Sequence, residues 1–257
     1  MEQKKESVKV KIDGKEIEVP YRSTILEAAE KLGIHIPTLC RHPALSTIGA
    51  CRVCLVKVKF PWGRERIVTA CNFPIEDDIE VFTDSEDVRR DRKVIIELLL
   101  ARSPNVPVIQ QLAKAYGIEE PRFPKEDEGC ILCGLCVRVC EEAIGAKAID
   151  FVGRGVHEMV APPFGVQSET CIGCGACASV CPTGYIQVVD KDGKRYIDVW
   201  HAEFELALCK ECGKPITTKK HIEYLKKKID LPDYIFELCD ECKRKFYVER
   251  IAVLGHM

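Results

Sequence analysis

The chain has 257 residues, with 38 lysines and arginines against 40 aspartates and glutamates, and a formal net charge of −2. This near-balance gives no electrostatic reason to expect a protein that binds nucleic acid or an anionic membrane. No run of 18 apolar residues occurs, so we expect no direct insertion into a membrane. The hydrophilic start at Met1–Glu6 lacks the apolar stretch of a signal peptide, and we therefore expect a cytoplasmic protein.

The sequence contains 16 cysteines. Thiols stay reduced in a protein that is not exported, so metal ligation is the common remaining use for so many of them. They fall into four sets of four, with none left over, and this partition makes metal or cluster ligation the leading hypothesis.

The N-terminal part predicts a β-grasp ferredoxin domain over residues 1–86. Alternating apolar and polar residues on both sides of Asp13-Gly14 predict a β-hairpin. An amphipathic helix follows from Ile25 to Leu32, capped by Ser23 or Thr24 and ended by a glycine. The predicted strands are 8–12, 16–19, 54–59 and 66–70.

The first set of cysteines has the spacing C-x10-C-x2-C-x16-C and comprises Cys40, Cys51, Cys54 and Cys71. Plant ferredoxins have four residues between their first two ligands, so this is a different variant. The surrounding order of hairpin, helix, cysteine loop and strands favours a 2Fe-2S cluster, with zinc as the alternative. Two histidines, His35 and His42, flank Cys40. Four thiolates already complete the ligand set, so we expect these histidines to cap the loop or to contact the ligands from outside the set.

Residues 72–129 contain neither cysteine nor histidine. Helices are predicted from Val88 to Arg102 and from Ile109 to Tyr116, within a helical linker over 87–126 that packs the flanking domains together.

The middle region carries the most specific signal, two consecutive C-x2-C-x2-C-x3-C strings in a predicted domain over 127–200. This is the run with which bacterial ferredoxins hold 4Fe-4S clusters. The fourth cysteine of each string is expected to open a helix and to ligate the other cluster. Glycines between the ligands, Gly134, Gly173 and Gly175, let backbone N–H groups turn toward the sulfurs. The first predicted cluster is held by Cys130, Cys133, Cys136 and Cys181, and the second by Cys140, Cys171, Cys174 and Cys177. His157 is expected in an irregular strand between the strings.

The last set has the spacing C-x2-C-x26-C-x2-C and comprises Cys209, Cys212, Cys239 and Cys242, in a small module over 201–257. Two such pairs suit a tetrahedral, zinc-ribbon-like site. A third 4Fe-4S cluster and a rubredoxin-like iron remain alternatives, because all three need four thiolates. A helix is predicted over 218–228, with Ile222, Leu225 and Ile229 facing inward. The overall fold class is α+β.

Residues 37–46 and 49–56 resemble the N-terminal cluster domain of the large iron–sulfur subunit of complex I. The module also occurs in iron-only hydrogenases, some formate dehydrogenases and the small diaphorase subunit of NAD-linked hydrogenases. The resemblance spans about residues 5–200, and the first four cysteines match the family's binuclear ligands one for one. Longer relatives carry a further site of one histidine and three cysteines, which residues 72–129 cannot build. Arg154-Gly155 and residues 162–165 resemble the short diaphorase-type subunit.

The resemblance implies an electron-transfer subunit that works between a flavin- and NAD(H)-binding subunit and a catalytic subunit such as a hydrogenase or formate dehydrogenase. No dinucleotide fingerprint, P-loop or Ser-His-Asp set is evident, so we expect no catalytic residues in this chain. The alternatives are a freestanding polyferredoxin and an iron–sulfur sensor that binds nucleic acid. The sensor is disfavoured, because four loaded sites would bring the net charge to about −10.

Overall fold

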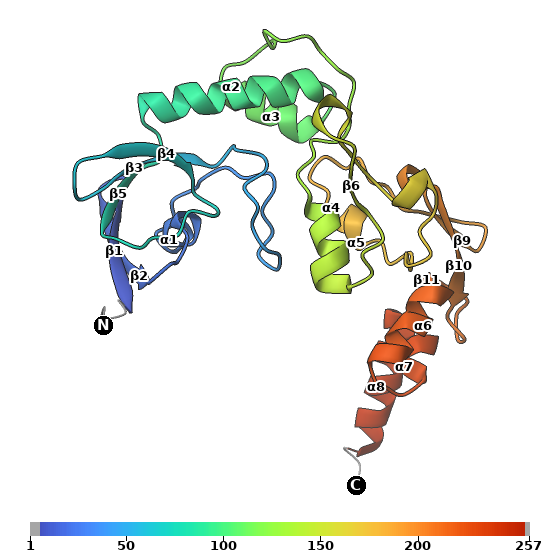
Figure 1. The fold of residues 1–257 in the computed structure, drawn as a ribbon. Coiled ribbons are helices and arrows are strands. Elements are labelled where there is room, and N and C mark those ends of the chain that lie inside the picture. Colours follow the sequence, from blue (N-terminus) through green and yellow to red (C-terminus); the bar gives the residue numbers. More distant parts are fainter. Residues whose placement is uncertain (1–5, 255–257) are drawn as a thin grey trace. The chain divides into compact units, whose positions relative to one another are not determined.

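The computed structural model describes residues 6–254, and side chains up to residue 248. The chain forms two compact units (Figure 1). The first comprises the residues up to Leu135 together with Pro182–Tyr185, and the second comprises Cys136–Cys181 and the residues from Ile186 onward. Each unit is described by itself. Among the described residues, no helix combines the length and the apolar character that a bilayer crossing requires.

The first unit begins with a five-stranded mixed sheet and one helix, the arrangement expected of a β-grasp domain. The strands run in the order β2-β1-β5-β3-β4, with β1 and β5 parallel and the other neighbours antiparallel. Their bounds are Ser7–Ile12 (β1), Lys15–Pro20 (β2), Leu55–Lys59 (β3), Glu65–Thr69 (β4) and Ile79–Phe82 (β5). All four predicted strands are present, and β5 is an additional one.

Local chemistry explains the first elements. Asp13 and Gly14 both have positive φ, as the predicted two-residue hairpin turn requires. Helix α1 (Ile25–Lys31) starts at Thr24, whose hydroxyl accepts from the Glu27 N–H while the Glu27 carboxylate accepts from the Thr24 N–H. Alternate residues of β1, including Val10 and Ile12, are buried in the core that this sheet forms with α1.

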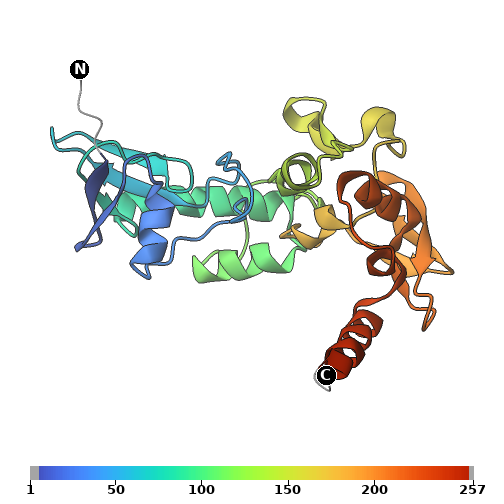
Figure 2. The ribbon, with the colours of Figure 1, turned by 90° about the horizontal axis from the view of Figure 1, so that it is seen from below.

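Two longer helices complete the first unit. Helix α2 (Glu86–Arg102) starts at Ser85, whose hydroxyl caps Val88. Its observed start lies two residues before the predicted one, because the cap is a serine outside the apolar pattern. Helix α3 (Pro107–Ala115) has proline in its first turn and lies beside α2 in both views (Figure 1 and Figure 2).

The second unit opens with short elements around the cysteine strings. They are α4 (Leu135–Arg138), a π-helix (Val139–Ile144), the hairpin β6 (Asp150–Val152) and β7 (Met159–Ala161), and α5 (Ala176–Ser179). His157 lies in a 3-10 turn between β6 and β7, so its expected place in a strand was wrong.

A second sheet follows, in the order β11-β10-β9-β8. Its strands are β8 (Val189–Lys191), β9 (Lys194–Ile197), β10 (Ala202–Leu208) and β11 (Pro215–Thr218). The chain then forms α6 (Lys219–Lys228), α7 (Tyr234–Glu237) and α8 (Asp240–Leu254). Helix α6 matches the predicted one, but Ile229 is exposed, because the backbone leaves the helix there and turns extended.

Candidate metal centres

The first cysteine set gathers in the N-terminal domain. Cys40 and Cys51 lie on the long loop between α1 and β3, Cys54 immediately precedes β3, and Cys71 follows β4. All four side chains are buried, between 1% and 6% exposed. The backbone N–H of Cys51 donates to the Cys40 Sγ over 3.5 Å. The loop approaches Asn72 so closely at Gly49 that a Cβ there would lie 2.9 Å from the Asn72 Nδ2.

These four thiols lie so close together that each shifts the pKa of its neighbours. Hydrogen bonds from the Cys51 and Cys71 side chains lower the pKa of Cys40 to about 2, and a hydrogen bond from Cys71 lowers the pKa of Cys54 to about 7. Sharing protons with these neighbours raises the pKa of Cys51 and of Cys71, and burial raises both further. Four buried sulfurs of this kind form the donor set that iron–sulfur clusters use, so the residues present fit such a cluster.

His42 has the capping role expected of it, because its Nδ1 accepts from the Ala44 N–H over 3.2 Å. His35 is exposed.

The predicted ligands of the first 4Fe-4S cluster are divided between the two units. Cys130 and Cys133 belong to the first unit, and Cys136 and Cys181 to the second. The Cys130 Sγ accepts from the Leu132 N–H over 3.4 Å, with Leu132 and Gly134 at positive φ as the loop turns around the sulfur. The grouping of these four cysteines stays a prediction from their spacing.

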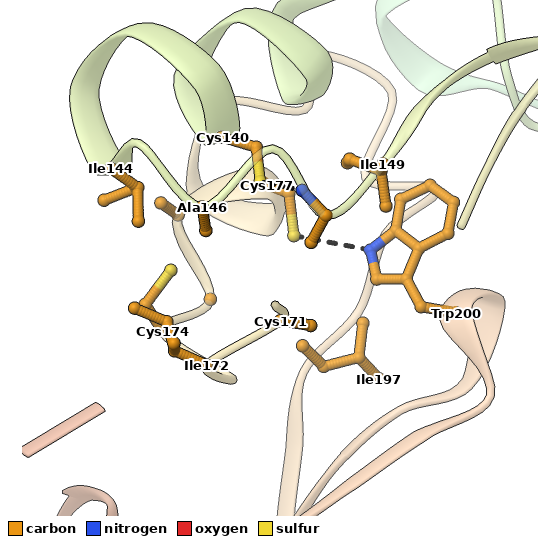
Figure 3. Close-up of a pocket in the computed structure, with 13 residues that line it drawn as sticks. Cys140, Ile144, Ala146, Ile149, Cys171, Ile172, Cys174, Cys177, Ile197 and Trp200 are labelled. Carbon is orange, nitrogen blue, oxygen red and sulfur yellow. Dashed lines mark hydrogen bonds between the residues drawn. The ribbon is translucent and has the colours of Figure 1, made fainter. Parts of the chain in front are cut away.

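The predicted ligands of the second 4Fe-4S cluster all lie in the second unit and line one pocket (Figure 3). The rest of its lining is apolar: Ile144, Ala146, Ala148, Ile149, Ile172, Gly175, Ala176, Ile197 and Trp200. Cys177 lies on α5, whereas Cys140 lies inside the π-helix and Cys181 follows α5. The expectation that each string's fourth cysteine opens a helix was therefore wrong.

Two N–H groups donate to sulfurs of this pocket. The Ala148 N–H reaches the Cys140 Sγ over 3.3 Å, and the indole N–H of Trp200 reaches the Cys177 Sγ over 3.5 Å, the dashed line in Figure 3. Burial raises the pKa of Cys177 to about 11, although the indole hydrogen bond opposes this shift. Such N–H···S bonds stabilise a ligating thiolate and tune the potential of a bound cluster.

The C-terminal segment is fastened to the walls of this pocket. The Thr218 hydroxyl donates to the Ile172 carbonyl, and the Tyr224 hydroxyl donates to the Ile144 carbonyl. Gly173 has a positive φ and packs against Phe204, so that a Cβ at this position would lie 2.6 Å from the ring. Strand β10 and helix α6 therefore hold both chain segments that supply the pocket's cysteines.

The last cysteine set forms a compact site at the end of the second unit. The four Sγ atoms all lie within 4.8 Å of one another, and those of Cys212 and Cys239 are 3.6 Å apart. One pair lies in the turn between β10 and β11, where Gly213 takes a positive φ. The other pair lies just before α8 and in its first turn. The donor set of four converging thiols fits a metal ion.

Backbone N–H groups favour the thiolate form at one position of this site. Burial raises the pKa of Cys209, but hydrogen bonds from the N–H groups of Cys239, Cys212 and Glu211 outweigh that effect and lower it to about 6. Burial and the hydrogen bonds shared with its neighbours raise the pKa of Cys242 to about 12. Cys212 is the exposed member of the set.

Sequence reasoning missed three residues around these centres. Trp200 belongs to no motif, and nothing in the sequence pairs it with Cys177. Arg92 and Arg102 on α2 hydrogen-bond to backbone carbonyls beside Cys54 and at Cys130. Arg92 carried a signal, since it occupies the helix face of Val88 and Ile96, where a charged residue interrupts an apolar stripe.

Two family profiles match the chain. One described as a 2Fe-2S iron-sulfur cluster binding domain matches residues 5–86. The other, described as a 4Fe-4S dicluster domain, matches residues 129–185 and 170–218. The expected order of a 2Fe-2S domain before a 4Fe-4S dicluster domain is thereby confirmed, whereas the domain boundaries and the assignment of individual cysteines to clusters stay predictions.

The chain is similar to parts of much larger proteins. It is 40% identical over 173 residues to the NADPH-Fe(3+) oxidoreductase subunit alpha of Geobacter sulfurreducens, an alignment that covers 58% of this chain and 20% of that protein. It is 34% identical over 173 residues to the NADH-ubiquinone oxidoreductase 75 kDa subunit of Reclinomonas americana, covering 58% of this chain and 25% of the relative. The chain thus spans a quarter or less of the length of these relatives.

A solved structure covers a similar stretch. A chain of the NAD+-reducing [NiFe]-hydrogenase in its H2-reduced state superposes with a TM-score of 0.53 and 30% identity, over 60% of this chain and 74% of that one. The resemblance inferred from the cysteine loops is confirmed. This protein belongs to the same family as that hydrogenase chain, and it is an iron–sulfur electron-transfer protein that joins a 2Fe-2S binding domain to a 4Fe-4S dicluster domain.

Proposed function

We propose that this chain is the electron-relay subunit of a multisubunit oxidoreductase linked to NAD(H) and flavin. The proposal is supported by the relatives, which are named as subunits of NAD(P)H oxidoreductases or come from an NAD+-reducing hydrogenase. One partner would bind flavin and NAD(H). The other would be a catalytic subunit such as a hydrogenase or formate dehydrogenase.

The observation that carries the proposal is the pocket of the second cysteine string. Four sulfurs converge in an otherwise apolar lining that includes Trp200, so ligation by sulfur is the chemistry that this pocket offers. When bound, an iron–sulfur cluster takes up and releases single electrons. The residues of this pocket would hold the cluster, keep water away and donate hydrogen bonds to its ligands.

The cysteines are assigned to clusters as follows. Cys40, Cys51, Cys54 and Cys71 hold one 2Fe-2S cluster. Cys130, Cys133, Cys136 and Cys181 hold one 4Fe-4S cluster, and Cys140, Cys171, Cys174 and Cys177 hold the other. The corresponding segments are a 2Fe-2S domain over 1–86, a helical linker over 87–126, a dicluster domain over 127–200 and a metal-binding module over 201–257.

At the last site we assign a single zinc ion to Cys209, Cys212, Cys239 and Cys242. A tetrahedral zinc with bonds of about 2.3 Å to sulfur places its ligands about 3.8 Å apart. The separation of 3.6 Å between the Cys212 and Cys239 sulfurs, and the limit of 4.8 Å for the whole set, suit such a mononuclear ion. A cubane contains four irons within the shell of its ligating sulfurs and would spread them farther apart.

We assign the protein to the cytoplasm, where the reducing environment keeps 16 thiols available for metals.

The test is an anaerobic purification of the native complex. We expect about ten irons and ten inorganic sulfides per chain, with about one zinc. A flavoprotein should co-purify, and NADH should reduce the clusters only when that flavoprotein is present. A colourless, iron-free chain would refute the proposal, as would turnover of a substrate by this chain alone.

Two intermediate results change particular assignments. About 14 irons without zinc would mean a third 4Fe-4S cluster at the last site. A fully loaded chain that purifies alone would indicate a freestanding polyferredoxin.

A further inference from the structure

Helix α2 carries two arginines whose guanidinium groups bind the backbone beside two different cysteine sets. Arg92 is 3% exposed. Its Nη2 donates to the Leu55 carbonyl over 2.5 Å and to the Thr83 carbonyl over 3.2 Å, and its Nη1 donates to the Tyr116 hydroxyl over 2.7 Å. Leu55 directly follows Cys54, so Arg92 attaches the helix to the chain beside a predicted 2Fe-2S ligand.

The C-terminal end of the same helix is attached to the first 4Fe-4S loop. The Nε of Arg102 donates to the Cys130 carbonyl over 2.9 Å. Just before this cysteine, the Glu126 N–H donates to the Ala101 carbonyl over 2.7 Å, and the Glu128 N–H donates to the Arg102 carbonyl over 3.0 Å. The segment that leads into Cys130 is therefore bound to the last turn of α2 by three hydrogen bonds.

The helix between these attachments is built to be stiff. It runs from Glu86 to Arg102 without proline or glycine, and its buried residues include Val88, Ile96 and Leu100. The two arginines are ten positions apart, which corresponds to about 15 Å along the helix axis. Both arginines, Cys54 and Cys130 lie in the first unit, so this spacing is a property of one compact body.

We propose that α2 is a spacer that holds the segments of Cys54 and Cys130 in the first unit at one separation, with Arg92 and Arg102 as its positioning residues. This spacing would contribute to the gap between the 2Fe-2S cluster and the first 4Fe-4S cluster. The inference rests on the cluster assignment made under Proposed function. Electron tunnelling depends steeply on distance, so a relay needs its neighbouring centres held at one separation. The buried charge of Arg92 also favours the reduced form of a nearby cluster, because reduction adds negative charge.

The test compares the anaerobically loaded full chain with its Arg92→Met and Arg102→Met variants. Both clusters are reduced, and EPR measures the magnetic coupling and the distance distribution between them. We expect a single narrow distance in the parent chain and a broadened distribution in either variant at unchanged iron content. The matched control is Arg90→Met, which removes an exposed arginine of the same helix that pairs only with Asp87 and Asp91 among the contacts of the described residues. It should leave the distribution unchanged.

The 2Fe-2S potential gives a second measurement. The potential should fall in Arg92→Met, because the positive charge is lost. It should be largely restored in Arg92→Lys, which keeps the charge but lacks the planar guanidinium group. A merely structural role for Arg92 predicts no such rescue.

A third measurement needs no cluster. In the metal-free chain, amide hydrogen exchange at residues 126–130 should be about tenfold faster in Arg102→Met than in the parent, since a hydrogen bond to a charged group is lost. Arg102→Lys should show a smaller increase, and it serves in place of Arg102→Met if that variant does not fold. The proposed spacer role of α2 would be refuted if amide exchange at residues 126–130 stayed unchanged in the Arg102 variants. It would also be refuted if the inter-cluster distance stayed unchanged in the loaded variants. A parent chain that binds no clusters would instead overturn the proposed function.

Discussion

The first and last four-cysteine sites of the chain differ in the apolar core that surrounds them. The first set, around Cys54, is part of a large apolar core that unites the five-stranded sheet with α1. Among the side chains described up to residue 248, the last set, around Cys239, has a buried cluster of Cys209, Leu238 and Cys239, with Ile216, Tyr234, Cys242 and Phe246 packed at its edge. One site lies within a folded domain, whereas the other makes up most of the core of its own module.

This difference has an energetic consequence. Burying apolar side chains stabilises by about 25 cal/mol per Å², and the N-terminal domain has enough of them to fold on its own packing. A small module without such a core depends on its metal, because binding to the thiolates supplies the folding free energy. We therefore expect the N-terminal fold to survive loss of its cluster and the C-terminal module to melt on loss of its ion.

Removing one ligand from each site gives the largest expected contrast. Cys239→Ser should abolish metal binding and remove amide protection from residues 230–248, because no apolar core replaces the lost bonds. The matched variant Cys54→Ser should lose the 2Fe-2S cluster while β1, β3 and β5 stay protected. Hydrogen exchange with mass spectrometry, together with metal analysis, measures both. Full protection of residues 230–248 in metal-free Cys239→Ser would contradict the comparison.

Truncating a core side chain should have the next largest effect. Ile12 is fully buried in the N-terminal core, and Ile12→Ala should lower the free energy of unfolding of that domain by about 3 kcal/mol. Ile216→Ala, at the edge of the C-terminal cluster, should cost about 1 kcal/mol while the metal is bound. Native-state hydrogen exchange of β1 and β11 compares the two losses. Equal losses would show that packing supports both regions alike.

Acidification should also destabilise the two regions to different extents, but by less than the substitutions above. Protons compete for thiolates at every site, and the C-terminal module should lose its ion first on acidification, because its small described core holds the remaining ligands together less firmly. In the first unit, hydrogen bonds from Arg122 hold the pKa of Glu97 below its usual value. The stability that this pair contributes is therefore present above about pH 4.3 and is lost as the pH falls through the lowered pKa.

Glu97→Gln isolates this contribution. We expect the variant to be less stable than the parent by about 0.5 kcal/mol near neutral pH and equal to it below the lowered pKa. Thermal melting as a function of pH measures the difference. A constant difference down to pH 2 would show that the charge of Glu97 is not involved.

The N-terminal fold was the most predictable part of the chain. Alternation predicted β1 to β4, and the turn residues Asp13 and Gly14 identified the hairpin. Strand β5 was missed because its four residues, Ile79–Phe82, follow an acidic stretch and are too few to show a clear period. Its place in the centre of the sheet depends on pairing with β1 and β3, which are distant in sequence.

The cysteine spacings predicted which thiols come together at Cys209–Cys242, where all four sulfurs converge. The surroundings could not be predicted, because they depend on tertiary contacts between unrelated segments. Trp200 reaches Cys177 across 23 positions of sequence, and Arg92 reaches Leu55 across 37. The second sheet was not predicted either: its edge strand β8 is only three exposed residues long, and the alternation of β10 was overlooked beside the cysteine spacing.

The hydroxyl groups of Thr218 and Tyr224 bind the carbonyls of two lining residues, Ile172 and Ile144, of a pocket whose cysteines all precede them in the chain. During synthesis, the ribosome therefore releases the four thiols before it releases the helix that fastens their loops. The hydrogen bonds from Thr218 and Tyr224 to these loops can form only after that release, when iron and sulfide can already have reached the thiols. The order of these residues along the chain therefore allows cluster insertion to precede the attachment of α6.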